Sequence, residues 1–178
     1  MQQWKTRNKE LVLDERPWLT VERHTVELPS GQVIPNWQWV TTPDYINVVA
    51  VTEDNKFICF NQVKYGLIGD TLAIVGGYLN EGEEPLKAAQ RELREETGYE
   101  SSDWQALGHY RVDPNRGMAI GHFFLARCAR LVTTPIVDDL EEQHLLLLSR
   151  AEVEQALATE EFQVMAWTAA VALALRNL

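Results

Sequence analysis

Apolar and polar residues alternate with a period of two through much of the chain, which indicates strands with one buried face. The alternation over residues 18–40 is interrupted by Ser30-Gly31, and it therefore predicts an N-terminal antiparallel hairpin. The same reasoning predicts strands at residues 45–52, 56–62, 72–75, 104–110 and 119–131. The chain is therefore expected to be built mainly from strands, with a few helices between and after them.

Helical periodicity replaces the alternation after residue 84. Pro85 suits the first turn of a helix, where its missing N–H would be unpaired anyway, and Gly98 suits the left-handed position that ends one. A helix is predicted over residues 85–97, with Leu86, Ala89 and Leu93 on its inward face.

Two more helices are predicted near the end of the chain. A capping box begins the first, because Ser149 is followed three residues later by Glu152. An apolar stripe predicts the second over residues 162–176.

Carboxylates crowd the outward side of the helix at residues 85–97. Glu92, Glu95 and Glu96 lie within five positions, and like charges one turn apart repel each other unless cations neutralise them. Glu92 and Glu96 are placed to hold one hard cation, and Mg²⁺ fits such oxygen ligands well, with Mn²⁺ also possible. Arg91 and Glu83 are predicted to orient these carboxylates through forked hydrogen bonds.

The spacing of these residues follows the pattern G-x5-E-x7-R-E-U-x-E-E-x-G-U, in which U is a bulky apolar residue. The chain supplies Gly77, Glu83, Arg91, Glu92, Leu93, Glu95, Glu96, Gly98 and Tyr99. This run resembles the Nudix box, and Tyr99 is its one departure, in a position that is usually aliphatic.

The resemblance implies an α+β Nudix fold, in which a mixed β-sheet is sandwiched between α-helices. Residues 45–178 would form the Nudix catalytic domain. Residues 1–44 would form an N-terminal antiparallel strand extension that serves as a dimerisation element, so a homodimer is expected.

The segment before the box, FNQVKYGLIGDTLAIVGGYLNEGE, resembles the ADP-ribose and nucleoside diphosphate sugar pyrophosphatase branch of that family. Pro114, fifteen residues after Tyr99, is a further feature of the branch. Lys64 stands where the branch often has arginine, and Ala73 and Val75 replace its usual glutamate and proline. The branch hydrolyses a nucleoside diphosphate sugar to a nucleoside monophosphate and a sugar phosphate.

The resemblance also implies roles for the site residues. Glu92, Glu96 and the carbonyl of Gly76 would be metal ligands, and Glu95 a ligand or a group that orients water. Arg91 would support them.

The catalytic base of this branch comes from a loop after the box. Glu141 is the first candidate for that role, and Asp139 and Glu142 follow. The alternative is that this acidic run is only a solvated loop.

Trp37 and Trp39 share one face of their predicted strand, where they would stack on the substrate or pack in the core or the dimer. Arg111, Pro114 and Arg116 belong to a loop that would contact the organic ends or the diphosphate, and Lys64 is a further candidate contact.

Composition narrows the choice of partners. The formal net charge of −10 disfavours a long nucleic-acid footprint, so a small nucleotide is expected. The chain has neither a long apolar run nor a secretory signal pattern, which predicts a cytoplasmic protein without a membrane partner.

Two other functions stay open. One is hydrolysis of a nucleoside triphosphate or a capped RNA end. The other is a Nudix module that senses a nucleotide without cleaving it, although the complete box disfavours that reading.

Overall fold

The computed structural model describes residues 1–136 and 142–178 of the 178-residue chain. These residues divide into two compact units. The first unit contains residues 1–44 and 110–120, and the second contains residues 45–109 and 121–178.

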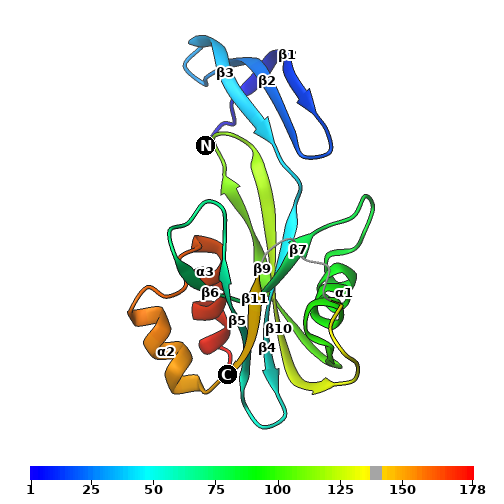
Figure 1. Cartoon of the computed structure of the whole chain (residues 1–178). Helices are drawn as coiled ribbons and strands as arrows, with labels where there is room; N and C mark the ends of the chain where they lie inside the picture. The colour runs from blue at the N-terminus through cyan, green and yellow to red at the C-terminus, as the bar shows by residue number, and fades with distance from the viewer. Residues whose placement is uncertain (137–141) are drawn as a thin grey trace. The chain divides into compact units, whose positions relative to one another are not determined.

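The first unit contains a three-stranded antiparallel sheet in the order β1-β2-β3 (Figure 1). Its strands are β1 (Lys5–Glu15), β2 (Leu19–Glu27) and β3 (Val33–Thr41). The predicted hairpin corresponds to β2 and β3, with the turn at Ser30-Gly31 between them. The strand β1 was not predicted, because polar residues dominate it and every one of its residues is exposed.

The second unit is built on a mixed sheet with the order β11-β5-β4-β10-β8. Its strands are β4 (Tyr45–Thr52), β5 (Phe57–Val63), β6 (Asp70–Ala73), β7 (Val75–Tyr78), β8 (Tyr99–Glu100) and β11 (Gln143–Leu148), together with most of β9 (Asp103–Asp113) and β10 (Met118–Leu131). The pair β4 and β10 is parallel, while β7 and β5 pair with β4 in the antiparallel sense.

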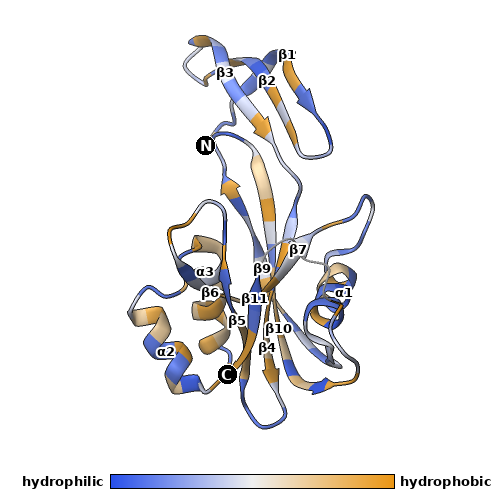
Figure 2. Cartoon of the chain, in the orientation of Figure 1, coloured by the Kyte–Doolittle hydropathy of each residue, from blue (hydrophilic) through white to orange (hydrophobic). Residues whose placement is uncertain are grey.

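Helices cover both faces of this sheet. The helix α1 (Pro85–Thr97) lies on one face, and α2 (Arg150–Ala158) and α3 (Met165–Leu175) lie on the other (Figure 1). The helix α1 is largely hydrophilic and α3 largely hydrophobic (Figure 2). This arrangement confirms the predicted α+β class with a mixed sheet between helices.

The core of the second unit is formed by apolar side chains of β4, β5, β10 and the three helices. Ile46, Val48, Leu93, Leu125, Val153 and Val171 are among those that are almost wholly inaccessible to solvent. The carboxylate-bearing helix is therefore fixed by a continuous apolar cluster beneath it.

The inward face of α1 differs from the prediction at one position. Ala88, Ala89, Leu93 and Thr97 are buried, whereas Leu86 is exposed. Gly98 ends the helix in the left-handed conformation, at φ 75°, and its N–H bonds the carbonyl of Arg94. The helix bounds agree with the predicted residues 85–97 because proline and glycine mark both ends.

Three other elements depart from the sequence analysis. Gly76 and Gly77 lie within the strand β7, beyond the end of the strand predicted at residues 72–75. The strand β11 was not predicted because its run of four leucines lacks alternation, and α3 begins at Met165 instead of residue 162. In the described part of the chain, no helix is long and apolar enough to span a membrane.

Candidate active site

One guanidinium joins the carboxylates at the start and middle of α1. Arg91 Nε and Nη2 donate to the two oxygens of Glu83 at 2.9 and 3.0 Å. Arg91 Nη1 donates to Glu92 Oε1 at 2.7 Å and to Glu95 Oε2 at 3.1 Å. The predicted group of Arg91, Glu83, Glu92 and Glu95 is therefore brought together, with the arginine at its centre.

The turn before α1 completes the environment of Glu83. The backbone N–H of Asn80 donates to Glu83 Oε2 at 3.0 Å. The guanidinium of Arg91, followed by this N–H, lowers the pKa of the Glu83 carboxyl from 4.5 to about 2. Glu83 is therefore a fixed negative charge that anchors Arg91.

Glu92 experiences the opposite effect. Burial raises the pKa of its carboxyl, and the guanidinium of Arg91 partly opposes that rise. Burial of a charged oxygen is unfavourable unless a cation or hydrogen-bond donors surround it. Glu92 is therefore suited to bind a cation.

Two glycines of β7 make room for polar side chains on opposite faces of the sheet. A Cβ at Gly77 would overlap the carboxylate of Glu92 on the α1 side. A Cβ at Gly76 would lie 2.5 Å from the Asn47 Nδ2 atom. Because successive residues of a strand point to opposite faces, Asn47 lies on the side away from Glu92.

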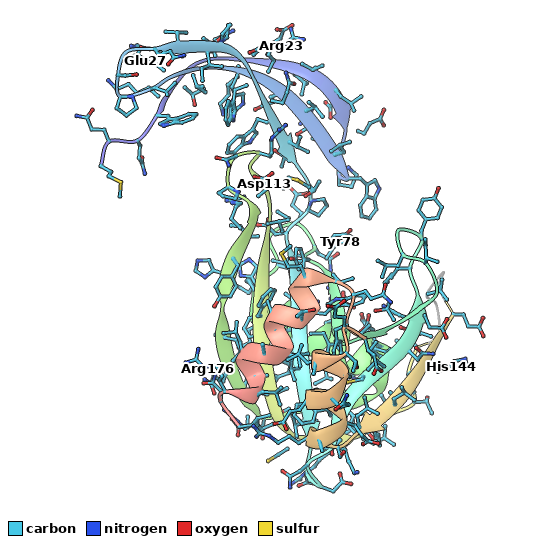
Figure 3. All side chains as sticks on the ribbon, turned by 90° about the vertical axis from the view of Figure 1, so that its left-hand side faces the viewer. Arg23, Glu27, Tyr78, Asp113, His144 and Arg176 are labelled. Carbon is cyan, nitrogen blue, oxygen red and sulfur yellow. The ribbon has the colours of Figure 1, made fainter. Side chains whose placement is uncertain are left out.

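A cavity of about 320 Å³ opens beside these residues in the second unit. Its walls come from β4, β5, β7, α1, the first residue of β11 and the N-terminal end of α3. The lining includes Asn47, Gln62, Lys64, Gly76, Tyr78, Glu96, Gln143 and Trp167. Tyr78, at the end of β7, is labelled in Figure 3.

Glu96 links this cavity to the carboxylate cluster. It lines the cavity, and its Oε2 accepts a hydrogen bond of 3.4 Å from the N–H of Gly76. Glu92, Glu96 and the Gly76 carbonyl all offer oxygen ligands. A cation would neutralise the partly buried charge of Glu92, so this set of ligands fits a hard divalent ion. Among the described residues, no group of three or more acidic, histidine or cysteine side chains is placed to hold a metal ion, so waters and substrate oxygens would complete the shell.

The predicted aromatic contacts lie in the first unit. Trp37 Nε1 donates to the carbonyl of Asn115 at 2.8 Å, and the ring of Trp39 fills the space where a Gly117 side chain would lie. Trp37 also meets Trp4 edge to face, and Trp39 stacks on His24. Both indoles therefore make contacts within this unit, and each is partly exposed.

The loop predicted to bind substrate joins β9 to β10. Arg111 Nη1 donates to the carbonyls of Gly117 and Met118 at 3.2 and 3.3 Å. The backbone N–H of Arg116 donates to the carbonyl of Asp113 at 3.3 Å, and Pro114 and Arg116 are exposed. Asp113 is labelled in Figure 3.

The candidate bases divide into two groups. Glu141 and Asp139 lie outside the described residues. Glu142 is described, with 85% of its side chain exposed, and its Oε1 lies 3.6 Å from Nε2 of His144. His144 is labelled in Figure 3.

Several cavity residues were missed by the sequence analysis, namely Asn47, Gln62, Gln143 and Trp167. Asn47 offered a signal, because it is the one amide inside the apolar strand β4, and it is only 3% exposed. The other three come from separate elements whose meeting depends on the fold.

We expect the anchoring role of Glu83 to appear in the pH dependence of stability. The folded-state pKa lies below the ordinary value, so the ionised carboxylate stabilises the fold above about pH 4.5, and this contribution is lost as the pH falls toward 2. Glu83→Gln should lower the free energy of unfolding at pH 7 by about 1–2 kcal/mol, and the difference from wild type should shrink below pH 4.5.

The measurement is urea unfolding in metal-free buffer across this pH range. Glu81→Gln, in the same exposed turn, is the matched control and should follow the wild type. A deficit in Glu83→Gln that is the same at pH 3 and pH 7 would show that ionisation of Glu83 contributes nothing.

Comparison with known proteins relates these features to characterised families. The NUDIX domain model matches residues 41–170, and the model of the nucleoside diphosphate sugar hydrolase N-terminal domain matches residues 4–40. A solved structure described as a crystal structure of ADP compounds hydrolase superposes with a TM-score of 0.83 at 21% identity, covering 100% of this chain and 95% of that one. At that identity the likeness concerns the fold.

Two curated relatives are similar in sequence. The ADP-ribose pyrophosphatase of Bacillus subtilis (strain 168) is 32% identical over 136 residues, which are 76% of this chain and 72% of that protein. The methanol dehydrogenase activator of Bacillus methanolicus is 35% identical over 102 residues, so the match spans 57% of this chain and about half, 55%, of that relative. Since the NUDIX model covers well over half of the sequence, the chain belongs to the NUDIX domain family.

Proposed function

We propose that this protein hydrolyses the diphosphate linkage of ADP-ribose or another nucleoside diphosphate sugar with the help of a divalent metal ion. The observation that carries the proposal is the carboxylate cluster organised by Arg91, beside a cavity whose wall includes Glu96. The resemblance of Pro114 and the segment before the box to the sugar-nucleotide branch supports the substrate class, as does the name of the Bacillus subtilis relative.

In the proposed reaction a water oxygen forms a bond to one phosphorus, and the bond from that phosphorus to the bridging oxygen breaks. The bridging oxygen leaves with the other phosphate and the water gives up a proton, so the products are a nucleoside monophosphate and a sugar phosphate. Little covalent chemistry falls to the protein in such a transfer, so its residues act by positioning and by charge.

Glu92, Glu96 and the carbonyl of Gly76 would hold the metal, with Glu95 as a further ligand or a group that orients the water. A bound divalent ion supplies positive charge for the diphosphate oxygens and lowers the pKa of water bound to it. Mg²⁺ is our first choice, and Mn²⁺ accepts the same ligands. Arg91 positions Glu92 and Glu95 through the hydrogen bonds described above.

The base that accepts the proton of the water is proposed to be Glu141, with Asp139 and Glu142 as the other candidates. The proposal for Glu141 rests on its position in the sequence after the box. Glu142 is available to solvent, because 85% of its side chain is exposed.

We propose a small-molecule substrate and no nucleic-acid partner, on the basis of the net charge of −10. The cytoplasmic location stays a prediction from the sequence. Another relative, a CMP-5'-(N-acetyl-N-hydroxy-3-aminopropyl)phosphonate hydrolase of Streptomyces rubellomurinus, is 31% identical over 136 residues, so cytidine compounds belong in the test.

The substrate class is tested by hydrolysis with Mg²⁺ across ADP-ribose, ADP-glucose, GDP-mannose, UDP-glucose, CDP-ribose, deoxynucleoside triphosphates and capped RNA. Added phosphatase releases phosphate from the monoester products, and the phosphate is measured. We expect cleavage of diphosphate sugars. Cleavage of triphosphates or capped RNA alone would assign the alternative hydrolase class, and no cleavage would favour a sensing module.

The metal assignment is tested by Glu96→Gln, which should fold normally and lose at least about a hundredfold in kcat, the scale of a lost transition-state charge contact. Glu81→Gln is the control for a lost charge in the same region and should keep full activity. The same assay on Glu141→Gln, Asp139→Asn and Glu142→Gln should show the largest loss for Glu141. Normal turnover in folded Glu96→Gln would contradict the metal assignment.

We propose that the first unit pairs with a second copy of the chain. Only His24 and Val26 are buried within residues 1–44, and the large apolar side chains exposed there include Leu11, Val12, Trp18 and Val33. A sheet this small buries too little apolar surface to be stable without a partner surface.

Light scattering should therefore give a mass of about twice the 20.3 kDa of one chain. Replacing Leu11 and Leu13, which are exposed on β1, with lysine should lower that mass, because charges are costly at an apolar interface. A wild-type mass of one chain at micromolar concentration would contradict the dimer.

A further inference from the structure

A short segment after β10 is hydrogen-bonded to the C-terminal end of α1, within the second unit. It comprises residues 132–136 and is called the strap below. The N–H groups of Val132 and Thr133 donate to the carbonyl of Gly98 at 2.9 and 3.2 Å. The strap lies beside α1 in Figure 1, where it is drawn in yellow. The residue that ends the carboxylate-bearing helix is therefore held by a segment from elsewhere in the chain.

A second contact reaches into the last turn of α1. The final carbonyls of an α-helix have no partner in the helix itself. The N–H of Tyr99, just past the helix, donates to Oγ1 of Thr97 at 3.0 Å. The carbonyl of Glu95 instead accepts a hydrogen bond of 2.8 Å from the N–H of Ile136, in the strap. The strap therefore caps a carbonyl that belongs to one of the candidate site residues.

Backbone hydrogen bonds, and not apolar burial, attach the strap to the helix. Each of its five residues is exposed, and the side chains of Val132 and Ile136 are 52% and 57% exposed. Because so little apolar surface is covered, the strap contributes little to the core. Its main structural effect is to hold the end of α1.

Gly98 is the point of closest approach. Its φ is 75°, and a Cβ built on it would lie 2.1 Å from the carbonyl oxygen and 3.0 Å from the carbonyl carbon of Thr133. Any side chain there would push the strap away from the helix. Glycine thus meets two requirements at this position, the left-handed conformation that ends α1 and the close passage of a second backbone.

The end of α1 is also where candidate metal ligands lie. Glu95 and Glu96 belong to its last turn, since the helix ends at Thr97. Helix ends fray, and free carbonyls at a C-terminus repel nearby carboxylates. Mg²⁺ requires near-ideal octahedral geometry, so its ligands must be held in place. A segment that caps these carbonyls and stops fraying would meet both needs.

We infer that the strap positions Glu95 and Glu96 for metal binding, through the N–H of Ile136 and the space left at Gly98. Ile136 and Gly98 are positioning residues, because they contact α1 and would not touch the metal. The inference rests on the metal assignment of the proposed function. Loss of groups that orient metal ligands commonly weakens metal affinity by about 10- to 100-fold, which sets the expected scale.

The first test is Gly98→Asn, with Mn²⁺ as the probe and no substrate present. Asparagine tolerates the left-handed conformation, so the main change is the Cβ that meets Thr133. We expect the Kd for Mn²⁺, measured from the EPR signal of the free ion, to rise about tenfold or more. Gly31→Asn is the matched control, because Gly31 has φ 86° and open space around its Cβ position. It should bind Mn²⁺ as the wild type does.

The second test removes the hydrogen bond and adds no atom at Gly98. Ile136→Pro eliminates the N–H that donates to Glu95, whereas Ile136→Ala keeps that N–H and shortens an exposed side chain. The Kd for Mn²⁺ should rise in Ile136→Pro and stay within about twofold of the wild type in Ile136→Ala. If Gly98→Asn does not fold, this pair of variants decides.

Stability and metal dependence separate positioning from a general loss of structure. The Tm is measured in metal-free buffer, and a merely structural role would lower it and leave the Mn²⁺ affinity of the folded protein unchanged. Because the carboxylates remain in Gly98→Asn, excess Mg²⁺ should restore its kcat for ADP-ribose to within about threefold of the wild type. The Mg²⁺ concentration for half-maximal activity should rise about tenfold or more.

Unchanged Mn²⁺ affinity in folded Gly98→Asn and Ile136→Pro would overturn the inference. A loss of kcat that persists at saturating Mg²⁺, with unchanged Mn²⁺ affinity, would also overturn it, because the strap would then act on the acidic run that follows it in the sequence. If the wild type binds Mn²⁺ but cleaves no diphosphate sugar, the proposed substrate class fails and the Mn²⁺ affinities still decide the inference. A wild type that binds no Mn²⁺ would overturn the metal assignment and the inference together.

Discussion

The arrangement of the site depends on the contact between Arg91 and the carboxylates around it. Without a cation between them, the carboxylates of Glu83, Glu92 and Glu95 would repel one another. The guanidinium uses its forked geometry to bond all three, with both outer nitrogens and Nε engaged. A lysine would offer one point charge in place of this fork, so the same set of carboxylates would lose its fixed orientation.

The two members of the cluster with shifted carboxyl pKa values differ in a way that matches their proposed tasks. Glu83 sits under the guanidinium and a backbone N–H, and its lowered pKa keeps it ionised. Glu92 lies against β7, and burial raises the pKa of its carboxyl. Protein groups thus keep the Glu83 carboxylate ionised, whereas a bound cation would offset the cost of burying the charge of Glu92.

The sequence predicted the parts of the site that lie on one continuous segment. Spacing placed Arg91, Glu92, Glu95 and Glu96 on a helix whose ends Pro85 and Gly98 define, and local rules suffice for that. The cavity was not predicted, because Asn47, Gln62, Gln143 and Trp167 come from four elements that only tertiary pairing brings together. The strand β1 was missed for a different reason, since its polar residues carry no apolar alternation.

The strand β7 shows how one short element serves both halves of the proposed site. Because Gly77 has no side chain, Glu92 can lie against the strand on the α1 side. The absence of a side chain at Gly76 makes room for Asn47 on the opposite side. Each glycine weakens the strand, because glycine has more backbone freedom to lose than other residues. The polar groups admitted are the partly buried carboxylate of Glu92 and the carboxamide of Asn47, whose Oδ1 has no partner among the described residues, and both are unfavourable in the unliganded protein. A bound cation would offset the first cost, and a hydrogen-bonding group of the substrate would offset the second, so substrate binding would relieve both.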